Sequence, residues 1–240
     1  MRRLFPDPGE IPDDLALARA YELPPGRALR MDFIASLDGV IAVDGRSEGL
    51  QSPGDQRVFR TLRAVADVVL VGHGTASAEG YGPVGPGSRL GRLREQLGRP
   101  PVVPIAVVSR RASLAPGDKL AVPGTLLITC AAADAGRRAA LADAGVEVLV
   151  CGDEDVALRV ALDVLAERGL ERVTCEGGPQ LLRTALTEGV VDELDLTIAP
   201  ALVGGSARLL DGPLAGVVRT ELRQLLEEDG VLFARYTVVR

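Results

Sequence analysis

The sequence predicts an α/β domain with a mostly parallel central sheet, helices on both of its faces and antiparallel strands at its C-terminal end. Short apolar runs alternate with helical patterns through most of the chain, which is typical of a parallel sheet. Near the C-terminus, the extended runs 222–226 and 232–239 flank an Asp229-Gly230 pair. An Asp-Gly pair between two such runs indicates a hairpin, so we expect the sheet to finish with antiparallel strands.

Composition places the chain among ordinary globular proteins. It has 240 residues, of which 47% are apolar and 25% charged, enough for one large domain with a buried core. The formal charge of −6 gives no general attraction to nucleic acid or to an anionic membrane. We therefore expect a small-molecule ligand, with no nucleic-acid partner and no membrane partner.

The cysteines and the single histidine argue against a metal site. Cys130, Cys151 and Cys175 each end an apolar run and form no CxxC pair, and His73 is the one histidine. No grouping of these residues has the spacing of a zinc site. There is no secretory signal pattern and no run of about 18 apolar residues that could cross a bilayer. These observations predict a cytoplasmic protein without a bound metal.

The first 28 residues are expected to form an extended arm. They contain five prolines, which disfavour a central strand, and a short helical pattern at 15–21. No linker or internal repeat divides the remainder, so 29–240 is expected to be a single domain. Its expected strands are the mostly apolar runs 29–35, 68–71, 101–108, 126–129, 146–150, 172–175 and 195–203. Its expected helices, which have amphipathic spacing, are one opened by Ser52-Pro53 and others at 92–96, 132–144, 155–168 and 180–188.

A Gly-Gly-Pro turn follows the run 172–175. Without Cβ atoms, Gly177 and Gly178 let a flat anionic ligand lie against the backbone, and Pro179 suits the first turn of the next helix. The free N–H groups of that helix start could hold phosphate. A tight turn in any α/β protein gives the same pattern, so the pattern alone leaves both interpretations open. The candidate diphosphate-binding residues are the turn and the helix start, with Glu176 at the edge: Gly177, Gly178, Pro179, Gln180 and Leu181.

A second glycine-rich segment follows the run 68–71. The loop expected there, Gly72-His73-Gly74-Thr75, resembles part of a dinucleotide fingerprint, although Ser77 replaces its third glycine. Ser109 and Arg110 follow the run 101–108, where an arginine could bind the 2′-phosphate of NADP or simply be surface charge. Asp55 lies in the first turn of the helix after Ser52, where an acid also favours the helix dipole by itself.

Four motifs, in this order, resemble the pyrimidine reductase domain of riboflavin biosynthesis, in the dihydrofolate reductase-like superfamily. The resemblance covers about 29–239. The motifs are Ser36-Leu37-Asp38-Gly39-Val40-Ile41-Ala42, then Leu62-Arg63 leading to Val71-Gly72-His73-Gly74-Thr75, then Glu176-Gly177-Gly178-Pro179, then Asp192-Glu193-Leu194 with Ile198-Ala199-Pro200. The resemblance implies the three-layer fold of that superfamily and a homodimer.

The resemblance also implies NADPH as the hydride donor and roles for individual residues. The segments Gly72–Thr75 and Gly178–Thr184 match cofactor-contacting segments, and Ala35 and Ile41 would line the nicotinamide. Glu176 and Ser47 match substrate-contacting positions. An Asp-x-Pro-x-Leu-Thr-x-Arg pattern that binds the ribosyl phosphate in riboflavin reductases is replaced by 79–84, so Arg89 or Arg92 would have to reach in.

Asp55 keeps a second substrate class open. It aligns with the helix acid that holds the pteridine in dihydrofolate reductases, and archaeal pyrimidine reductases can carry an acid there too. The favoured hypothesis is an NADPH-dependent reductase of 5-amino-6-(5-phosphoribosylamino)uracil, with Asp55 or Glu176 anchoring the pyrimidine or relaying a proton. The alternatives are a dihydrofolate or other pteridine reductase and a nucleotide-binding protein without catalysis.

Overall fold

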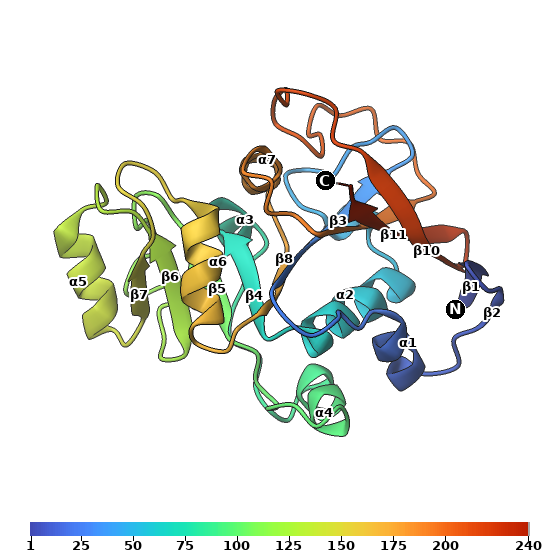
Figure 1. Cartoon of the computed structure of the whole chain (residues 1–240), viewed down its shortest axis with the longest axis horizontal. Helices are drawn as coiled ribbons and strands as arrows, with labels where there is room; N and C mark the ends of the chain where they lie inside the picture. Colours follow the sequence, from blue (N-terminus) through green and yellow to red (C-terminus); the bar gives the residue numbers. More distant parts are fainter. Residues whose placement is uncertain (240) are drawn as a thin grey trace.

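A single eleven-stranded sheet runs through the computed structural model, which describes residues 1–239 (Figure 1). The strand order is β2-β1-β10-β11-β9-β3-β8-β4-β5-β6-β7. The seven strands from β9 to β7 are parallel to one another: β9 (Glu193–Ala199), β3 (Ala28–Ser36), β8 (Arg172–Cys175), β4 (Val68–Gly72), β5 (Ile105–Val108), β6 (Thr125–Thr129) and β7 (Glu147–Val150). The other four pair antiparallel: β2 (Gly9–Glu10), β1 (Arg2–Phe5), β10 (Thr220–Glu228) and β11 (Val231–Val238).

Of the three neighbouring strands β3, β8 and β4, the chain reaches β8 last. It leaves β3, crosses to β4 and proceeds outward to β7, and then returns to place β8 between β3 and β4. Because all three strands are parallel, their carboxyl ends meet at one edge of the sheet. Ligands of open α/β sheets bind at such an edge where the strand order reverses.

Helices cover both faces of the sheet. One face carries α6 (Leu158–Ala166) and α7 (Pro179–Thr187), and the other carries five helices: α1 (Asp14–Ala20), α2 (Pro53–Val65), α3 (His73–Ala78), α4 (Arg89–Gln96) and α5 (Ala135–Asp143). Strand β4 serves both layers because successive side chains point to opposite faces. Val68 and Leu70 pack in the core beneath α6, whereas Val69 and Val71 pack in the other core.

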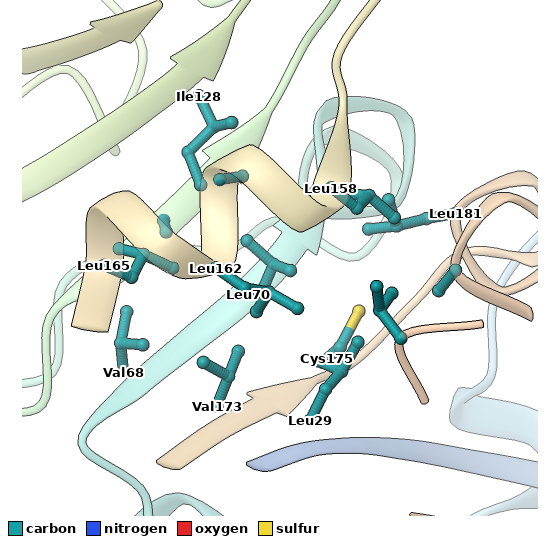
Figure 2. Packing of buried hydrophobic residues seen from close by; sticks show 14 of the residues in the cluster. Leu29, Val68, Leu70, Ile128, Leu158, Leu162, Leu165, Val173, Cys175 and Leu181 are labelled. Carbon is teal, nitrogen blue, oxygen red and sulfur yellow. The ribbon is translucent and has the colours of Figure 1, made fainter. Parts of the chain in front are cut away.

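The core beneath α6 is closed by leucines at helical spacing. Figure 2 shows Leu158, Leu162 and Leu165 of α6 above the side chains of β4 and β8, with Val173 beneath them. All four of these residues are buried. Their spacing puts one apolar stripe of the helix on the sheet, as expected for an amphipathic helix.

The N-terminal residues and the C-terminal hairpin pack together. Asp229 and Gly230 make the turn between β10 and β11, so the predicted hairpin is confirmed. Strand β1 pairs with both β10 and β2. Leu17 of α1 and Tyr21, the C-cap of that helix, pack in one cluster with Phe233 of the hairpin. The first 28 residues thus contain two short strands and a helix. Their separation from 29–240 as an arm stays a prediction.

The predicted α/β architecture, with a mostly parallel sheet finished by antiparallel strands, is confirmed. Two local expectations are wrong. The segment after β4 is not a loop, because α3 begins directly at His73. The extended piece expected at 195–203 ends with β9 at Ala199. Within residues 1–239, no helix is both long and apolar enough to cross a bilayer.

Candidate active site

A cavity of about 650 Å³ opens at the carboxyl ends of β3, β8 and β4. Its wall comes from those strand ends, from the first turns of α2, α3 and α7, and from the loops 41–51 and 78–82. Several predicted site residues line it: Ile41, Ser47, Asp55, Gly74, Thr75, Glu176, Gly178 and Pro179. The cavity therefore brings together motifs that are more than 100 residues apart in the sequence.

The turns after β4 and β8 are locked against each other. The Gly72 N–H donates to the Gly177 carbonyl at 2.7 Å. A Cβ on Gly177, which has φ +82°, would lie 2.8 Å from the Phe33 ring, and one on Gly178 would lie 2.6 Å from Thr75 Oγ1. Such distances leave no room for a side chain, so both glycines are required by packing. The Gly-Gly pair is a tight turn, and the same turn forms part of the cavity wall.

Helix α7 begins without a side-chain acceptor for its first N–H groups. Among the described helices of eight residues or more, only α7 has this property. In α6, the Glu188 carboxylate accepts the first N–H groups. In α2, α4 and α5, an N-cap side chain accepts one: Ser52, Ser88 and Asp134. Pro179 has no N–H, which leaves Gln180 and Leu181 as first-turn donors beside the cavity. An anion at the cavity wall would complete this helix start.

Glu176 is held from two sides. Arg63 of α2 donates Nε and Nη2 to its two oxygens at 2.6 and 2.7 Å, and the Tyr81 hydroxyl donates to Oε2 at 2.6 Å. The Arg63 guanidinium also lies 4.3 Å from the Phe59 ring centroid and 5.0 Å from that of Tyr81. Burial, with the charge of Glu176, raises the pKa of Tyr81 well above its usual value. Glu176 therefore lines the cavity, but both of its carboxylate oxygens already accept hydrogen bonds from side chains of the protein.

Asp55 is buried at the cavity wall in the first turn of α2. Ser52 caps this helix by accepting the Asp55 N–H at 3.0 Å, which leaves the Asp55 carboxyl free to face inward. Burial raises the pKa of Asp55 to about 6, and a hydrogen bond from Thr197 opposes part of that rise. A carboxyl of this kind exchanges its proton near neutral pH, which is the range that acid–base chemistry requires.

Asp32 is the acid that the sequence analysis missed. It lies in β3, half-buried in the cavity wall, inside an apolar run that reads as an ordinary strand. Burial, and then repulsion from Asp55, Glu176 and Asp195, raises its pKa well above the usual value. A signal was present, because charged residues alternate with apolar ones in both β3 and β9. Arg63 and Tyr81 were not predicted as site residues either.

The other predicted site residues do not line the cavity. Ala35 is buried in β3, Leu181 is in the core beneath α6, and His73 and Gln180 are in the first turns of their helices. Ser109 is buried after β5 and accepts the Ser113 N–H. Their cofactor-binding roles stay predictions.

Arg110 and the loop arginines Arg89 and Arg92 do not line the cavity. Arg110 donates to the Glu154 carbonyl at 3.1 Å and pairs with Asp155 at 2.8 Å on the surface after β5. Arg92 donates to the carbonyl of Gly87, and neither Arg89 nor Arg92 lines the cavity. Arg46 is closer.

Arg46 lies between two cavity-lining residues, Gly45 and Ser47. Its Nε donates to the Ala78 carbonyl at 3.0 Å, and its side chain is 49% exposed. Its ion pair with Glu48, at 3.8 Å, joins two exposed side chains and is correspondingly weak. Arg46 is therefore a cation at the cavity mouth whose terminal guanidinium N–H groups are available to a ligand.

Comparisons with known proteins identify the family. A 2,5-diamino-6-ribosylamino-4(3H)-pyrimidinone 5′-phosphate reductase of Methanothermobacter thermautotrophicus is 31% identical over 210 residues, which cover 85% of this chain and 94% of the relative. A pyrimidine reductase-like protein of Corynebacterium diphtheriae is also 31% identical, with a TM-score of 0.77 over 89% of this chain and 92% of its own. RibD of Acinetobacter baumannii shares the fold at 24% identity and a TM-score of 0.73, over 89% of this chain and 58% of its own. The family model of the RibD C-terminal domain matches residues 27–229. The resemblance expected from the motifs is confirmed: the chain belongs to the RibD C-terminal domain family.

Proposed function

We propose that this protein is an NADPH-dependent reductase in riboflavin biosynthesis, with 2,5-diamino-6-ribosylamino-4(3H)-pyrimidinone 5′-phosphate as its preferred substrate. One observation carries the proposal. A single cavity joins an uncapped helix start, suited to an anionic cofactor, to a buried carboxyl, Asp55, that exchanges its proton near neutral pH. The names of the archaeal relatives support the same reaction.

The residues present fit a dinucleotide. Gly178, Gln180 and Leu181 offer backbone N–H groups at the start of α7, and a Cβ on Gly74 would meet nothing within 4 Å, so the backbone there is open. Donors of this kind suit a diphosphate. Arg110, at the end of β5, would bind the 2′-phosphate. When bound, the cofactor supplies the hydride, while the protein orients the reactants and excludes water.

Asp55 favours a diaminopyrimidinone over a uracil. The 2-amino group and the adjacent ring N–H of the diaminopyrimidinone are two donors on one edge, which an ionised carboxylate can accept together. A uracil replaces the amino donor with a carbonyl acceptor at the same edge. Because the pKa of Asp55 is about 6, this carboxyl is mostly ionised at neutral pH and matches the two donors.

Arg46 supplies the cation that the substrate phosphate requires. Most charged side chains that line the cavity are carboxylates, and Arg63, the one arginine among residues 1–239 that lines it, is already paired with Glu176. Arg46 is exposed at the mouth, on the loop that also carries Ser47. We therefore place the ribosyl phosphate at Arg46 and the pyrimidine at Asp55, with the ribosylamino carbon between them.

The test is NADPH oxidation, followed at 340 nm, in parallel with three substrates. We expect turnover with the diaminopyrimidinone phosphate, slower turnover with 5-amino-6-(5-phosphoribosylamino)uracil, and none with dihydrofolate. A preference for the uracil would contradict the role given to Asp55. A preference for dihydrofolate would replace the proposed function by that of a pteridine reductase, and tight NADPH binding without any turnover would indicate a nucleotide-binding protein. The expected homodimer and cytoplasmic location stay predictions.

A further inference from the structure

A buried polar layer continues from the cavity into the interior of the sheet. We define it as Arg30 and Asp32 of β3, Glu193 and Asp195 of β9, Arg235 of β11 and Asp55 of α2. The strands β3 and β9 are parallel, and their register opposes Arg30 to Glu193 and Asp32 to Asp195. Side chains at opposed positions of neighbouring strands project to the same face, with backbones about 4.8 Å apart. Asp32 thus meets the cavity on one side and Asp195 on the other.

The layer contains more acids than bases. Its four carboxyls face two guanidinium groups, and the side-chain hydrogen bonds of both guanidiniums to these carboxyls go to Glu193. Arg30 Nε donates to Glu193 Oε1 at 2.6 Å, and Arg235 Nε donates to Glu193 Oε2 at 2.6 Å. Asp195 is only 3% exposed. A buried layer with unbalanced negative charge is stabilised when one of its carboxyls holds a proton.

Asp195 is the carboxyl least satisfied by its neighbours. Arg30 Nε is 2.8 Å from Asp195 Oδ2, but its N–H points at Glu193. Within the described residues, neither oxygen of Asp195 accepts a hydrogen bond. An ionised carboxylate buried in this way loses its hydration without replacement, whereas a protonated pair can share one hydrogen between two carboxyls. Asp32 is the opposed acid with access to the cavity.

Charged and titratable groups act on Asp32 or on the groups beside it in the layer. The acids are on α2, after β8 and on β9, and the bases and the phenol are deeper in the layer: Asp55, Glu176, Asp195, Arg30, Arg235 and Tyr21. Three carboxyls therefore disfavour ionisation of Asp32, and Arg30 favours it. The two arginines act mainly on the β9 acids. Burial, together with this balance of charges, favours the protonated form of Asp32.

We propose that Asp32 is a catalytic acid of the reduction and that Asp195, opposite it in the sheet, is a positioning residue that keeps a proton on it. This inference rests on the proposed function. In the reduction of the ring-opened imine, the imine carbon gains a hydride and the two C=N π electrons form a new N–H bond. The proton of that bond comes from the Asp32 carboxyl, which becomes a carboxylate and regains a proton from solvent at the cavity mouth. The nicotinamide co-substrate is oxidised in the same step.

The division of roles separates Asp32 from Asp55. Asp55 accepts the donors of the pyrimidine edge and should be ionised, whereas Asp32 donates a proton and should be protonated. Two carboxyls in one cavity can hold opposite states because the charge of one raises the pKa of the other. Binding of substrate by an ionised Asp55 would strengthen the hold of Asp32 on its proton.

Two measurements test the inference. The first is a carboxyl ¹³C titration of the full chain without ligand, with the Asp32 signal assigned by its loss in Asp32→Asn. We expect Asp32 to titrate well above the usual range of aspartate, and Asp195→Asn to lower its midpoint by about one pH unit or more. Asp195→Leu removes the same charge if the amide is not tolerated. Asp67→Asn is the matched control, since this acid pairs with Arg99 and Arg172 at the opposite edge of the sheet and should leave Asp32 unchanged.

The second measurement is the pH dependence of single-turnover NADPH oxidation. Asp32→Asn should lower the rate about 10²- to 10⁴-fold while NADPH still binds. Asp195→Asn should move the alkaline fall in rate to lower pH, which a loss of stability alone would not do. A normal midpoint for Asp32, or one that Asp195→Asn leaves unchanged, would overturn the inference. If the wild type has no turnover, the proposed function and the catalytic role of Asp32 fail, yet the titration still decides whether Asp195 holds its proton.

Discussion

The two faces of strand β3 are built from opposite kinds of side chain. Leu29, Met31 and Phe33 point into the apolar core with α6 and α7, whereas Arg30 and Asp32 point into the polar layer beneath α1 and α2. Both faces are buried, so burial alone does not distinguish them. The difference is that removal from water stabilises the apolar face, whereas the charges of the polar face lose their hydration and must pair with one another. One face provides stability, and the other provides groups with altered pKa values at the price of stability.

Of the substitutions that test this difference, removal of the central cation of the polar face should change the free energy of unfolding most. Arg30→Met removes the guanidinium that pairs with both Glu193 and Asp195, so that Glu193 keeps only Arg235 and Asp195 loses its ion pair, in a layer where Arg30 is 0% exposed. Removing one partner of such a buried pair costs about 3–5 kcal/mol. Urea unfolding at pH 7 should show this loss. Arg2→Met, whose ion pair with Glu227 is at the surface, should leave the midpoint nearly unchanged, and equal effects of the two changes would contradict the comparison.

On the apolar face, Leu162→Ala should lower the free energy of unfolding by about 3 kcal/mol at any pH. Leu162 is 3% exposed between α6 and the sheet, so its loss removes buried area and leaves a cavity. Val160 lies on the same helix but is 43% exposed, and Val160→Ala is the control with a small expected effect. Thermal unfolding at two pH values would check both parts. A strongly pH-dependent loss for Leu162→Ala would show that the two faces are coupled.

The pH dependence of stability should separate the faces through Asp55. Its pKa is about 6 in the folded state against 3.8 for the unperturbed group. Because the folded pKa is raised, the protonated form stabilises the fold fully below about pH 4, and that contribution is lost as pH rises through 6. The wild type should lose roughly 2–3 kcal/mol over this range on account of Asp55.

Asp55→Asn should reduce that loss, as measured by urea unfolding from pH 4 to pH 7. Glu10→Gln, at the exposed edge strand, is the control and should follow the wild type. If Asp55→Asn and the wild type lost stability in parallel, the buried acid would have an ordinary pKa, and the two faces would be less different than the structure implies.

The smallest effect should come from the cavity mouth, where solvent screens charge. Arg46→Gln should raise the KM for the phosphorylated substrate about tenfold, equivalent to roughly 1.4 kcal/mol, with little change in kcat or in the KM for NADPH. Arg92→Gln, on a helix away from the cavity, is the matched control. An unchanged KM in Arg46→Gln would place the substrate phosphate elsewhere.

Local signals predicted much of the fold. Ser52 and Pro53 mark the start of α2, Pro179 starts α7 after the Gly-Gly turn, and Asp229-Gly230 closes the last hairpin. Each signal acts through backbone groups a few residues away, so it can be recognised in a linear sequence. The error at His73 has the same origin. Glycines allow both a loop and a helix start, and packing of the two turns selects the helix.

The candidate site was predicted in part. Asp55, Glu176 and the two glycine turns line the cavity, but the sequence could not show that Arg63 and Tyr81 occupy the oxygens of Glu176. Asp32 was missed because one acid in a strand has no meaning until its neighbour is known. That neighbour, Asp195, is 163 residues further along the chain.

By itself, the sequence determined the kinds of element, the turns between them and the family, because propensities, caps and glycine requirements are local properties. The tertiary structure decided which carboxyls share one cavity and which of them have raised pKa values. The physical reason is that a pKa depends on burial and on charges within a few ångströms. The strand order brings β3, β8 and β9 together, and packing on the sheet adds α2. The chemistry of this protein is therefore set where distant strands meet.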